Sequence, residues 1–492
     1  MTSLTSTKLC FLPYCLLIFL YVSSPNWVAF PSATSTSDTE AKALLKWKTS
    51  LFPNQALNDL TWYNPPTHNN NANNSSSTNP KPRTRPCTWT GVSCNSAGSV
   101  SKIDLFNRGL QGTLHEFSFL SFPNLEYLNL SMNKLFDAIP PQISNLSKLI
   151  NLDLSNNKLS GKIPPEIGFL TNLQNLYLYK NKLNGSVPQE LFGAIPPQIS
   201  NLSKLIYLDL SDNKLSGKIP PEIGFLTNLQ NLCLNKNKLN GSVPQEIGQL
   251  KSLSVLNLNE NRLSGPLPMS IGNLRKLQLL HLRDNQLSGS IPQEIENLMN
   301  LVGLRLARNN FTGHLPQNLC RGGLLVNFTA NGNRLIGRIP KSLKNCKTLY
   351  RFRLDGNQLT GNISEDFGVY PNLNYITLSN NRFYGELSHK WGRSLHLTNL
   401  EIAGNNVTGS IPPVIGNLTQ LHLLNLSSNH LVGKIPMELG RVTSLVRLIL
   451  NNNQLSGGIP QELGSLTHLD YLDLSTNKLS QSIPSSLGNC TT

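Results

Sequence analysis

The chain has 492 residues, a formal net charge of +15 and only 14% charged residues, and it contains 89 Leu and 61 Asn. Average globular proteins carry roughly 25% charged residues, yet this chain is too rich in apolar residues to be disordered. Collagen is excluded because glycine does not recur at every third position. A composition dominated by Leu and Asn is unusual for an enzyme and points to internal repeats.

Residues 1–30 have the pattern of a secretory signal peptide. Lys8 precedes the 14-residue apolar run Leu9–Val22, and the polar residues Ser23 and Ser24 follow it. The run is too short to span a membrane, and its flanks are those of a cleaved signal; the alternative is a buried core helix. We expect cleavage between residues 24 and 33. The chain is then secreted, and it is held at the extracellular face of the plasma membrane only if a longer form carries an anchor.

Residues 38–98 are predicted to form an N-terminal cap. Ala41–Leu51 spaces its apolar residues as a helix does. Residues 64–86 are a low-complexity stretch of Asn, Ser, Thr and Pro that we interpret as a disordered insertion. Cys87 and Cys94 flank Trp89 and are expected to form a disulfide, which a secreted chain can keep. Such a cap would cover the leucines that the first turn of a repeat stack leaves exposed.

From residue 99 to residue 492 the pattern LxxLxLxxNxLxGxIPxxIGxL recurs about sixteen times. Asn occupies fifteen of the sixteen central slots, Arg108 being the exception, and the usual spacing is 24 residues. This is the signature of leucine-rich repeats. The two leucines of LxL point inward and the residue between them points outward, as in a strand. We expect each slot Asn to pair as a buried amide with backbone groups of its own and neighbouring turns. The predicted fold class is an α/β repeat solenoid whose concave face is a parallel β-sheet.

A tandem copy interrupts the regular spacing. Residues 135–190 and 191–246 differ at five of 56 positions, among them Tyr177, whose counterpart is Cys233. Two repeats span 48 residues, so the join at 191–194 carries eight extra residues. We expect a loop that bulges on the convex or flanking side; the alternative is a local disturbance of the stack.

Four cysteines lie in the repeats. Cys320 and Cys346 are 26 residues apart, about one repeat, so they are spatial neighbours and we predict a disulfide between them. Cys233 and Cys490 are left without partners. The sequence stops at Thr492 in mid-repeat, which would leave apolar side chains uncovered, and we therefore expect a truncated product.

Sequons of the form N-x-S/T agree with secretion. Two of them, at Asn129 and Asn425, lie in L-N-L strands, so glycans there would block the concave face and leave the stretch between them free for a ligand. We expect glycosylation at Asn129, Asn145, Asn184, Asn201, Asn240, Asn310, Asn327, Asn362, Asn406, Asn417 and Asn425.

The cap and the 24-residue repeat with its Ile-Pro step resemble the ectodomains of plant leucine-rich-repeat receptor-like kinases over nearly the whole mature chain. Four further segments, 319–323, 345–349, 366–372 and 387–391, look like the male-discoverer-interacting receptor-like kinase 2 type. The resemblance implies a plant-type arc, a secreted peptide ligand and a role in immunity or development. It also implies a Ser/Thr kinase domain, but only in a full-length version. This chain departs from the family there, so no catalysis is carried over.

Basic residues gather on the predicted concave face of the repeats with slots 285–357. Arginine forks suit carboxylate or sulfate groups of a peptide. Arg351 and Arg353 lie two residues apart on one strand, so both point to the same face. Their R-x-R is similar to the pair that grips the C-terminal carboxylate of peptide hormones in related receptors. The alternative is a solvated strand face on which Asp284 and Asp355 pair with some of these charges. The basic patch consists of His281, Arg283, Arg305, Arg308, Arg351 and Arg353. The candidate ligand-binding residues among them are His281, Arg283, Arg305, Arg351 and Arg353.

Further candidates on the same face are Tyr207, Asp209 and Tyr375. Exposed tyrosines on a rigid sheet favour a peptide-binding groove, although a structural role is the alternative for each of them. No nucleophile–base pair and no His/Cys/Asp cluster accompanies these residues, so we expect neither an enzyme nor a metal ion or other cofactor.

The sequence thus favours an extracellular receptor ectodomain that binds a secreted peptide on its concave face and recruits a leucine-rich-repeat co-receptor kinase. The alternatives are a soluble inhibitor of microbial cell-wall-degrading enzymes and a truncated decoy. The net positive charge is compatible with acidic cell-wall polysaccharide as an additional partner. Secretion argues against nucleic acid.

Overall fold

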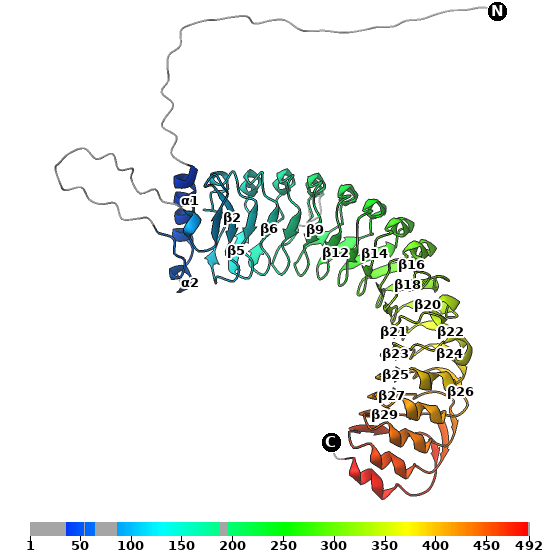
Figure 1. Ribbon diagram of the computed structural model, residues 1–492. Coiled ribbons are helices and arrows are strands. Elements are labelled where there is room, and N and C mark those ends of the chain that lie inside the picture. The colour runs from blue at the N-terminus through cyan, green and yellow to red at the C-terminus, as the bar shows by residue number, and fades with distance from the viewer. Residues whose placement is uncertain (1–35, 54, 64–85, 186–194, 491–492) are drawn as a thin grey trace, which may run out of the picture.

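The computed structural model describes residues 36–53, 55–63, 86–185 and 195–490. The expected signal peptide lies outside these residues, as does nearly all of the expected insertion at 64–86. The described residues form a curved solenoid, with α1 at its N-terminal end and strands along its inner side (Figure 1). The fold class predicted from the repeat is confirmed.

A 17-stranded sheet forms the concave face. Its strands pair in chain order and in parallel, except that β1 (Val92–Cys94) is antiparallel to β2. The parallel strands are β2 (Val100–Asp104), β4 (Tyr127–Asn129), β6 (Asn151–Asp153), β8 (Asn175–Tyr177), β9 (Tyr207–Asp209), β11 (Asn231–Cys233), β13 (Val255–Asn257), β15 (Leu279–His281), β17 (Gly303–Arg305), β19 (Asn327–Thr329), β21 (Arg351–Arg353), β23 (Tyr375–Thr377), β25 (Asn399–Glu401), β27 (Leu423–Asn425), β29 (Arg447–Ile449) and β31 (Tyr471–Asp473).

Most concave strands bury their central residue and leave the two that flank it at least partly exposed, while β4, β17, β19 and β23 also bury one flanking residue. In β13, Leu256 is fully buried while Val255 and Asn257 are half-exposed, and all three pair in register with β15. A strand has a side-chain period of two, so a shift by one residue would expose the leucine ladder. We call the outward residue before the buried one the first column and the outward residue after it the second column.

The slot asparagines form the expected ladder, and all fifteen of them take part. Asn261 is typical. Its Nδ2 donates to the carbonyl oxygens of Leu234, Leu258 and Asn259, and its Oδ1 accepts from the Leu239 N–H at 3.0 Å. One side chain thus connects two successive turns, which satisfies buried backbone groups that the tight turn leaves unpaired.

A second set of parallel strands, which the sequence reasoning did not predict, follows the slot asparagines. It forms one nine-stranded sheet and two of three strands. Its members are β3 (Gln111–Gly112), β5 (Lys134–Ala138), β7 (Lys158–Ser160), β10 (Ser216–Gly217), β12 (Lys238–Gly241), β14 (Arg262–Pro266), β16 (Gln286–Ser290), β18 (Asn310–His314), β20 (Arg334–Gly337), β22 (Gln358–Asn362), β24 (Arg382–Glu386), β26 (Asn406–Thr408), β28 (Val432–Gly433), β30 (Gln454–Gly457) and β32 (Lys478–Leu479).

Short helices on the outer side complete most turns (Figure 1). Most begin directly after a proline, which fixes φ without removing a needed N–H donor. They are η2 (Phe119–Ser121), η3 (Pro141–Asn145), η4 (Pro165–Phe169), η5 (Pro197–Asn201), η6 (Pro221–Phe225), η7 (Gln245–Gln249), η8 (Met269–Asn273), η9 (Gln293–Asn297), α3 (Lys341–Lys344), α4 (Ile363–Asp366), η10 (His389–Arg393), η11 (Pro413–Asn417), η12 (Met437–Arg441), η13 (Gln461–Ser465) and η14 (Ser485–Asn489).

The N-terminal cap consists of α1 (Thr36–Ser50), α2 (Gln55–Asn58), η1 (Pro86–Thr88) and β1. The buried Glu40 carboxylate of α1 accepts from the Ser99 hydroxyl at 2.5 Å and from the Val100 N–H, which fixes the helix to the first repeat. The helix begins earlier than predicted. Pro86, assigned to the insertion, is instead buried in η1 and so belongs to the cap.

The predicted disulfides, Cys87–Cys94 and Cys320–Cys346, are both present, and Cys233 and Cys490 are free. Across the tandem join, β8 and β9 pair in register, so the concave stack is undisturbed there. The extra residues at 191–194 lie outside the described residues. In the described part of the chain, no helix combines the length and apolarity that a membrane crossing requires.

Candidate ligand-binding site

The candidate site centres on Arg351 of β21 and Tyr375 of β23. They are in-register neighbours in the first column of the concave sheet. The Arg351 guanidinium lies over the Tyr375 ring, 4.2 Å from its centroid, and no carboxylate of the described residues forms an ion pair with it. Stacking holds the planar fork against the sheet while leaving its N–H donors available. Arg351 is therefore a cation in a fixed position with no anionic partner among the described residues.

Glu401 of β25 fixes the ring beneath that cation. The Tyr375 hydroxyl donates to Glu401 Oε1 at 3.0 Å. Burial and the Glu401 carboxylate both raise the pKa of Tyr375, so the hydroxyl remains a donor near neutral pH. Sequence reasoning missed Glu401. The available signal was an acidic residue in the second column two strands after the arginine pair.

Arg353 differs from Arg351 although both belong to the predicted R-x-R. Its guanidinium binds both oxygens of Asp355, with Nε and Nη2 at 3.2 and 3.1 Å, and it lies 5.7 Å from the Tyr375 ring. The pairing of charges that we kept as an alternative is thus what the structure shows for Arg353. A ligand would have to compete with Asp355 for this side chain.

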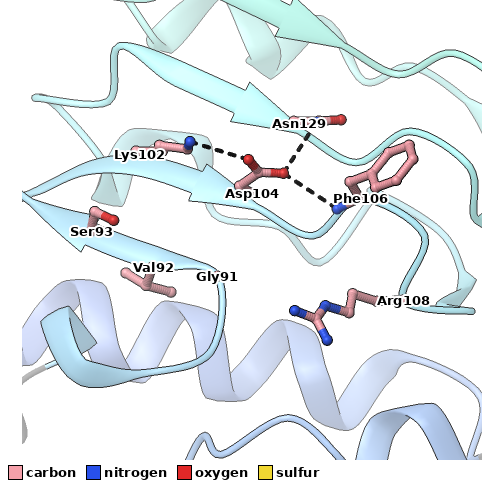
Figure 2. Close-up of a pocket in the computed structure, with 8 residues that line it drawn as sticks. All are labelled: Gly91, Val92, Ser93, Lys102, Asp104, Phe106, Arg108 and Asn129. Carbon is pink, nitrogen blue, oxygen red and sulfur yellow. Dashed lines mark hydrogen bonds and ion pairs between the residues drawn. The ribbon is translucent and has the colours of Figure 1, made fainter.

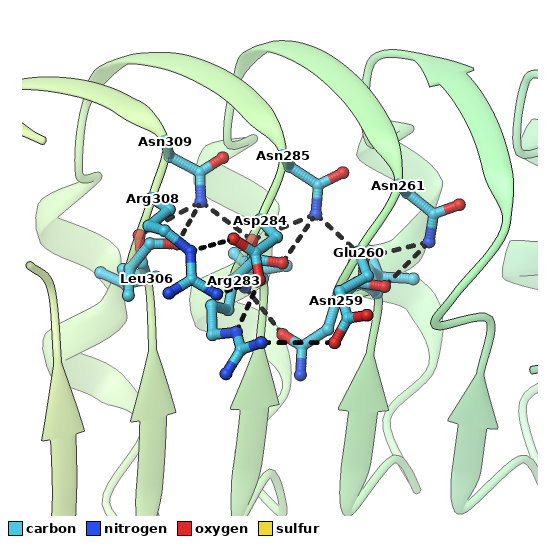
Figure 3. Close-up of polar contacts among 12 residues, drawn as sticks. Asn259, Glu260, Asn261, Arg283, Asp284, Asn285, Leu306, Arg308 and Asn309 are labelled. Atoms are coloured by element: carbon cyan, nitrogen blue, oxygen red, sulfur yellow. Dashed lines mark hydrogen bonds and ion pairs between the residues drawn. The ribbon is translucent and has the colours of Figure 1, made fainter. Parts of the chain in front are cut away.

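Pairing also accounts for Arg283 and Arg308 (Figure 3). Both bind the Asp284 carboxylate, with Nε of Arg283 and Nη2 of Arg308 at 2.7 and 2.6 Å, and Arg283 also reaches Glu260. Hydrogen bonds from Arg308 hold the pKa of Asp284 below its usual value despite some burial. This part of the predicted basic patch is a neutralised network.

His281 and Arg305 lie on the adjacent strands β15 and β17, in register. Burial, with a smaller contribution from the Arg305 charge, lowers the pKa of His281 to about 4. His281 is therefore neutral at physiological pH, and its buried Nε2 has no hydrogen-bond partner. Arg305 is exposed and has no ion pair within the described residues. Of the predicted basic patch, Arg305 and Arg351 remain as uncompensated charges.

The other predicted side chains, Tyr207 and Asp209, lie on β9 in the N-terminal half of the arc. The Tyr207 ring is 6.3 Å from that of Tyr177. The Asp209 carboxylate accepts from the Ser211 N–H at 2.9 Å, a local turn that asparagine and aspartate form in several repeats. Burial raises the pKa of Asp209, and it raises that of the neighbouring Cys233 thiol to about 12, so this thiol is unreactive. Six strand steps of the sheet separate β9 from β21, so these residues form no common site with Arg351.

A pocket of about 510 Å³ adjoins the Arg351–Tyr375 pair at the N-terminal ends of the same strands. Tyr350 and Asn374, which directly precede Arg351 and Tyr375 in the chain, contribute to it, and Tyr350 is 49% exposed. The remaining lining residues are Val326, Thr348, Asn372, His396 and Gln420. The sequence reasoning did not single out this pocket.

A second pocket, of about 580 Å³, lies where the cap meets the first repeat (Figure 2). Its central carboxylate, Asp104, is already satisfied by Lys102 at 3.1 Å and by Asn129 Nδ2 at 3.1 Å. Arg108 and the 52% exposed Phe106 complete its wall. In the described residues no group of three or more His, Cys, Asp or Glu side chains could hold a metal ion.

The expected sequons differ in accessibility. Asn129 is 8% exposed, and its Nδ2 donates to Asp104, so we expect no glycan on it in the folded protein. Asn327, which the sequence reasoning did not place on the strand face, lies in the first column beside Arg351. Asn425, Asn310 and Asn362 are half-buried. The exposed sequons are Asn145, Asn184, Asn201, Asn240, Asn406 and Asn417.

Family comparisons agree with this architecture. The leucine-rich repeat region family matches residues 192–320, and the leucine rich repeat family matches residues 124–146, 148–170, 396–418, 420–442, 444–466 and 468–490. Both families describe the repeat that the structure shows as a solenoid.

Its curated relatives are receptor kinases of Arabidopsis thaliana. A probable leucine-rich repeat receptor-like protein kinase is 42% identical over 114 residues, which is 23% of this chain and 9% of the relative. MDIS1-interacting receptor like kinase 2 is 41% identical over 120 residues, 24% of this chain and 10% of the relative. The matched stretches thus span about a tenth of these relatives. The two match almost equally, so the finer assignment to the second type stays a prediction.

Solved ectodomains of plant receptor kinases resemble the whole arc. The GASSHO1/SCHENGEN3 ectodomain from Arabidopsis thaliana, in complex with CASPARIAN STRIP INTEGRITY FACTOR 2, has a TM-score of 0.72 and 30% identity. That match covers 92% of this chain and 57% of the other. The Arabidopsis receptor kinase HAESA, in complex with the peptide hormone IDA and the co-receptor SERK1, has a TM-score of 0.53 and 28% identity, over 92% of each chain.

Proposed function

We propose that this protein is the extracellular, peptide-binding part of a plant receptor kinase, and that Arg351 takes the C-terminal carboxylate of a secreted peptide. The observation that carries the proposal is the guanidinium of Arg351, which is fixed on Tyr375 and has no anionic partner in the described residues. An arginine fork with free donors matches the geometry of a carboxylate. Resemblance to ectodomains solved with peptide hormones supports the same ligand class.

The neighbouring pocket indicates how the C-terminal end of the peptide is oriented on the sheet. Tyr350 and Asn374 line it directly beside Arg351 and Tyr375. A peptide whose last carboxylate meets Arg351 can therefore place its last side chain in the pocket, with its chain crossing the concave sheet. Arg353 is the second anion contact, once it exchanges Asp355 for the ligand.

Two further parts of the proposal rest on the relatives. HAESA was solved with the co-receptor SERK1, and we propose a leucine-rich-repeat co-receptor kinase as the partner of the peptide-bound form. Because the solved relatives are ectodomains of receptor kinases, we also propose that the arc lies at the extracellular face of the plasma membrane. An immune or developmental role is part of the same proposal.

The test is a double-mutant cycle between Arg351 and the ligand carboxylate. A random peptide library with free C-termini is selected on the wild-type ectodomain, and the best peptide is synthesised as the acid and as the C-terminal amide. We expect the amide to bind wild type about 10- to 100-fold more weakly, because a hydrogen bond to a charged group contributes roughly 1.5–3 kcal/mol. R351A should lose this discrimination.

The structure offers a matched control. Arg447 and Tyr471 repeat the first-column arrangement, with the guanidinium 5.0 Å from the ring centroid, on β29 and β31. R447A should keep the full preference for the acid. Equal binding of acid and amide to wild type, or an unchanged preference in R351A, would refute the carboxylate assignment.

A further inference from the structure

The sequon Asn327-Phe328-Thr329 lies on β19, the strand next to Arg351. Phe328 is buried, so Asn327 faces the concave side, where it is in register with Arg351 on one neighbouring strand and with Gly303 on the other. Neighbouring strands are about 4.8 Å apart. Any group attached to Asn327 therefore begins within one strand spacing of the candidate carboxylate site.

Three sequons lie on concave strands, and they differ in what their side chains do. The Asn129 amide donates to Asp104, and its Oδ1 accepts from Ser131. The Oδ1 of Asn425 likewise accepts from the N–H and hydroxyl of Ser427. The half-buried side chain of Asn327 makes no hydrogen bond to any described residue. Its amide is thus the one of the three that no local turn holds.

The two first-column neighbours of Asn327 differ in what they present to it. Gly303 has no side chain of its own, but Leu279 Cδ2 lies 2.9 Å from where its Cβ would be, so the more open direction from Asn327 is outward from the sheet. On the other side lie Arg351 and its stacked Tyr375. We propose that Asn327 carries an N-linked glycan, and that this glycan partly covers the Arg351–Tyr375 pair. A glycan is bulky and hydrated, so a glycan attached to Asn327 extends over the first column and covers the surface at Arg351 for part of the time.

The consequence for binding rests on the proposed function. A site that is open for only a fraction of the time shows an apparent affinity reduced by that fraction. If the glycan leaves Arg351 accessible for about a tenth to a third of the time, its removal raises the association rate about three- to tenfold. The preference for a free carboxylate is unchanged, because the contacts of the bound peptide are the same.

The experiment uses ectodomain secreted from plant cells. Mass spectrometry of its peptides first measures occupancy at Asn327, with the exposed sequon Asn406 as a positive control for the modification pathway. Surface plasmon resonance then compares wild type with N327Q, using the selected peptide as acid and as amide. N406Q is the matched control, because β26 lies outside the concave sheet. Endoglycosidase treatment of folded wild type replaces N327Q if that variant folds poorly.

We expect high occupancy at Asn327, faster association for N327Q and for the enzyme-treated protein, and no change for N406Q. An unmodified Asn327 beside a modified Asn406 would overturn the proposal, as would equal association rates for wild type and N327Q. Loss of the acid preference in N327Q would instead count against the peptide-carboxylate function. The two proposals therefore fail in different ways.

Discussion

The asparagine ladder makes a quantitative prediction for Asn309, which is 8% exposed in the middle of the arc. Its amide donates to three carbonyl oxygens at 2.9, 3.1 and 3.3 Å, and its Oδ1 accepts from the Leu287 N–H at 3.0 Å. In Asn309→Ala each of the three carbonyls keeps another donor, because neighbouring ladder asparagines or a backbone N–H also reach it. Only the Leu287 N–H loses its acceptor.

The expected loss of stability follows from this single unsatisfied N–H group. An unsatisfied buried N–H costs about 1–3 kcal/mol, and the lost amide packing adds about 1 kcal/mol. Asn309→Ala should therefore destabilise the protein by about 2–4 kcal/mol, less than the loss of four independent hydrogen bonds would suggest. Asn309→Asp should cost more at pH 7, because a carboxylate would face three carbonyl oxygens and cannot donate. Lowering the pH should reduce the difference in stability between Asn309→Asp and Asn309→Ala, because a protonated Asp regains a donor.

Urea unfolding followed by circular dichroism measures these differences, from the shift of the midpoint at constant m-value. Asn297→Ala is the control, because this exposed asparagine at the end of η9 has no side-chain hydrogen bond within the described residues. It should change stability by less than about 0.5 kcal/mol. If Asn309→Asp proved as stable as Asn309→Ala at pH 7, the donor role of the ladder amide would be wrong.

Three further predictions concern stability. His281, whose pKa is lowered to about 4, stays neutral in the folded state but is protonated in the unfolded state, so the free energy of unfolding falls as pH drops from 6.5 towards 4. Between pH 7 and pH 4.5, His281→Gln should therefore lose about 1–2 kcal/mol less stability than wild type, allowing for the partial exposure of the side chain. Urea midpoints at the two pH values measure this difference, and equal losses in both proteins would contradict the prediction. Replacing Cys320 and Cys346 by Ser opens a loop of sequence separation 26 and should cost about 3–4 kcal/mol in non-reducing urea titrations, a figure that an unchanged midpoint would disprove. A Cβ on Gly224 would lie 2.6 Å from the Glu246 carbonyl oxygen of the next turn. Thermal melts should therefore show a loss of about 1–3 kcal/mol for Gly224→Ala, and an unchanged melting temperature would exclude a steric role.

The sequence predicts the arc because each repeat restates the same physical constraints. The leucine period of two determines which side of each strand is buried, as Leu256 shows. A polar Asn amid apolar residues requires buried partners, as Asn261 has. A cysteine pair one repeat apart must be adjacent, as Cys320 and Cys346 are. Such features depend on periodicity alone, so one repeat predicts the next.

The candidate site was only partly predictable, because its properties depend on which neighbours the side chains select. Arg351 and Arg353 look equivalent in sequence, yet one stacks on Tyr375 and the other binds Asp355. Nothing in the spacing distinguishes them, since both arginines lie on one strand and point to the same face. The neutral state of His281 arises mainly from burial, and the burial of this side chain cannot be derived from the charges in the sequence. The flanking strands were missed because two to five residues of x-Leu-x-Gly are too short for a periodic signal.

The central claim is that Arg351, stacked on Tyr375, receives the carboxylate of a peptide. A crystal structure of the ectodomain with the selected acid peptide tests it most directly. The account predicts the terminal carboxylate within about 3 Å of the Arg351 guanidinium, with the last side chain in the pocket beside Tyr350. A peptide bound in the pocket at the cap, on the outer side of the arc, or with its carboxylate in solvent would contradict the account.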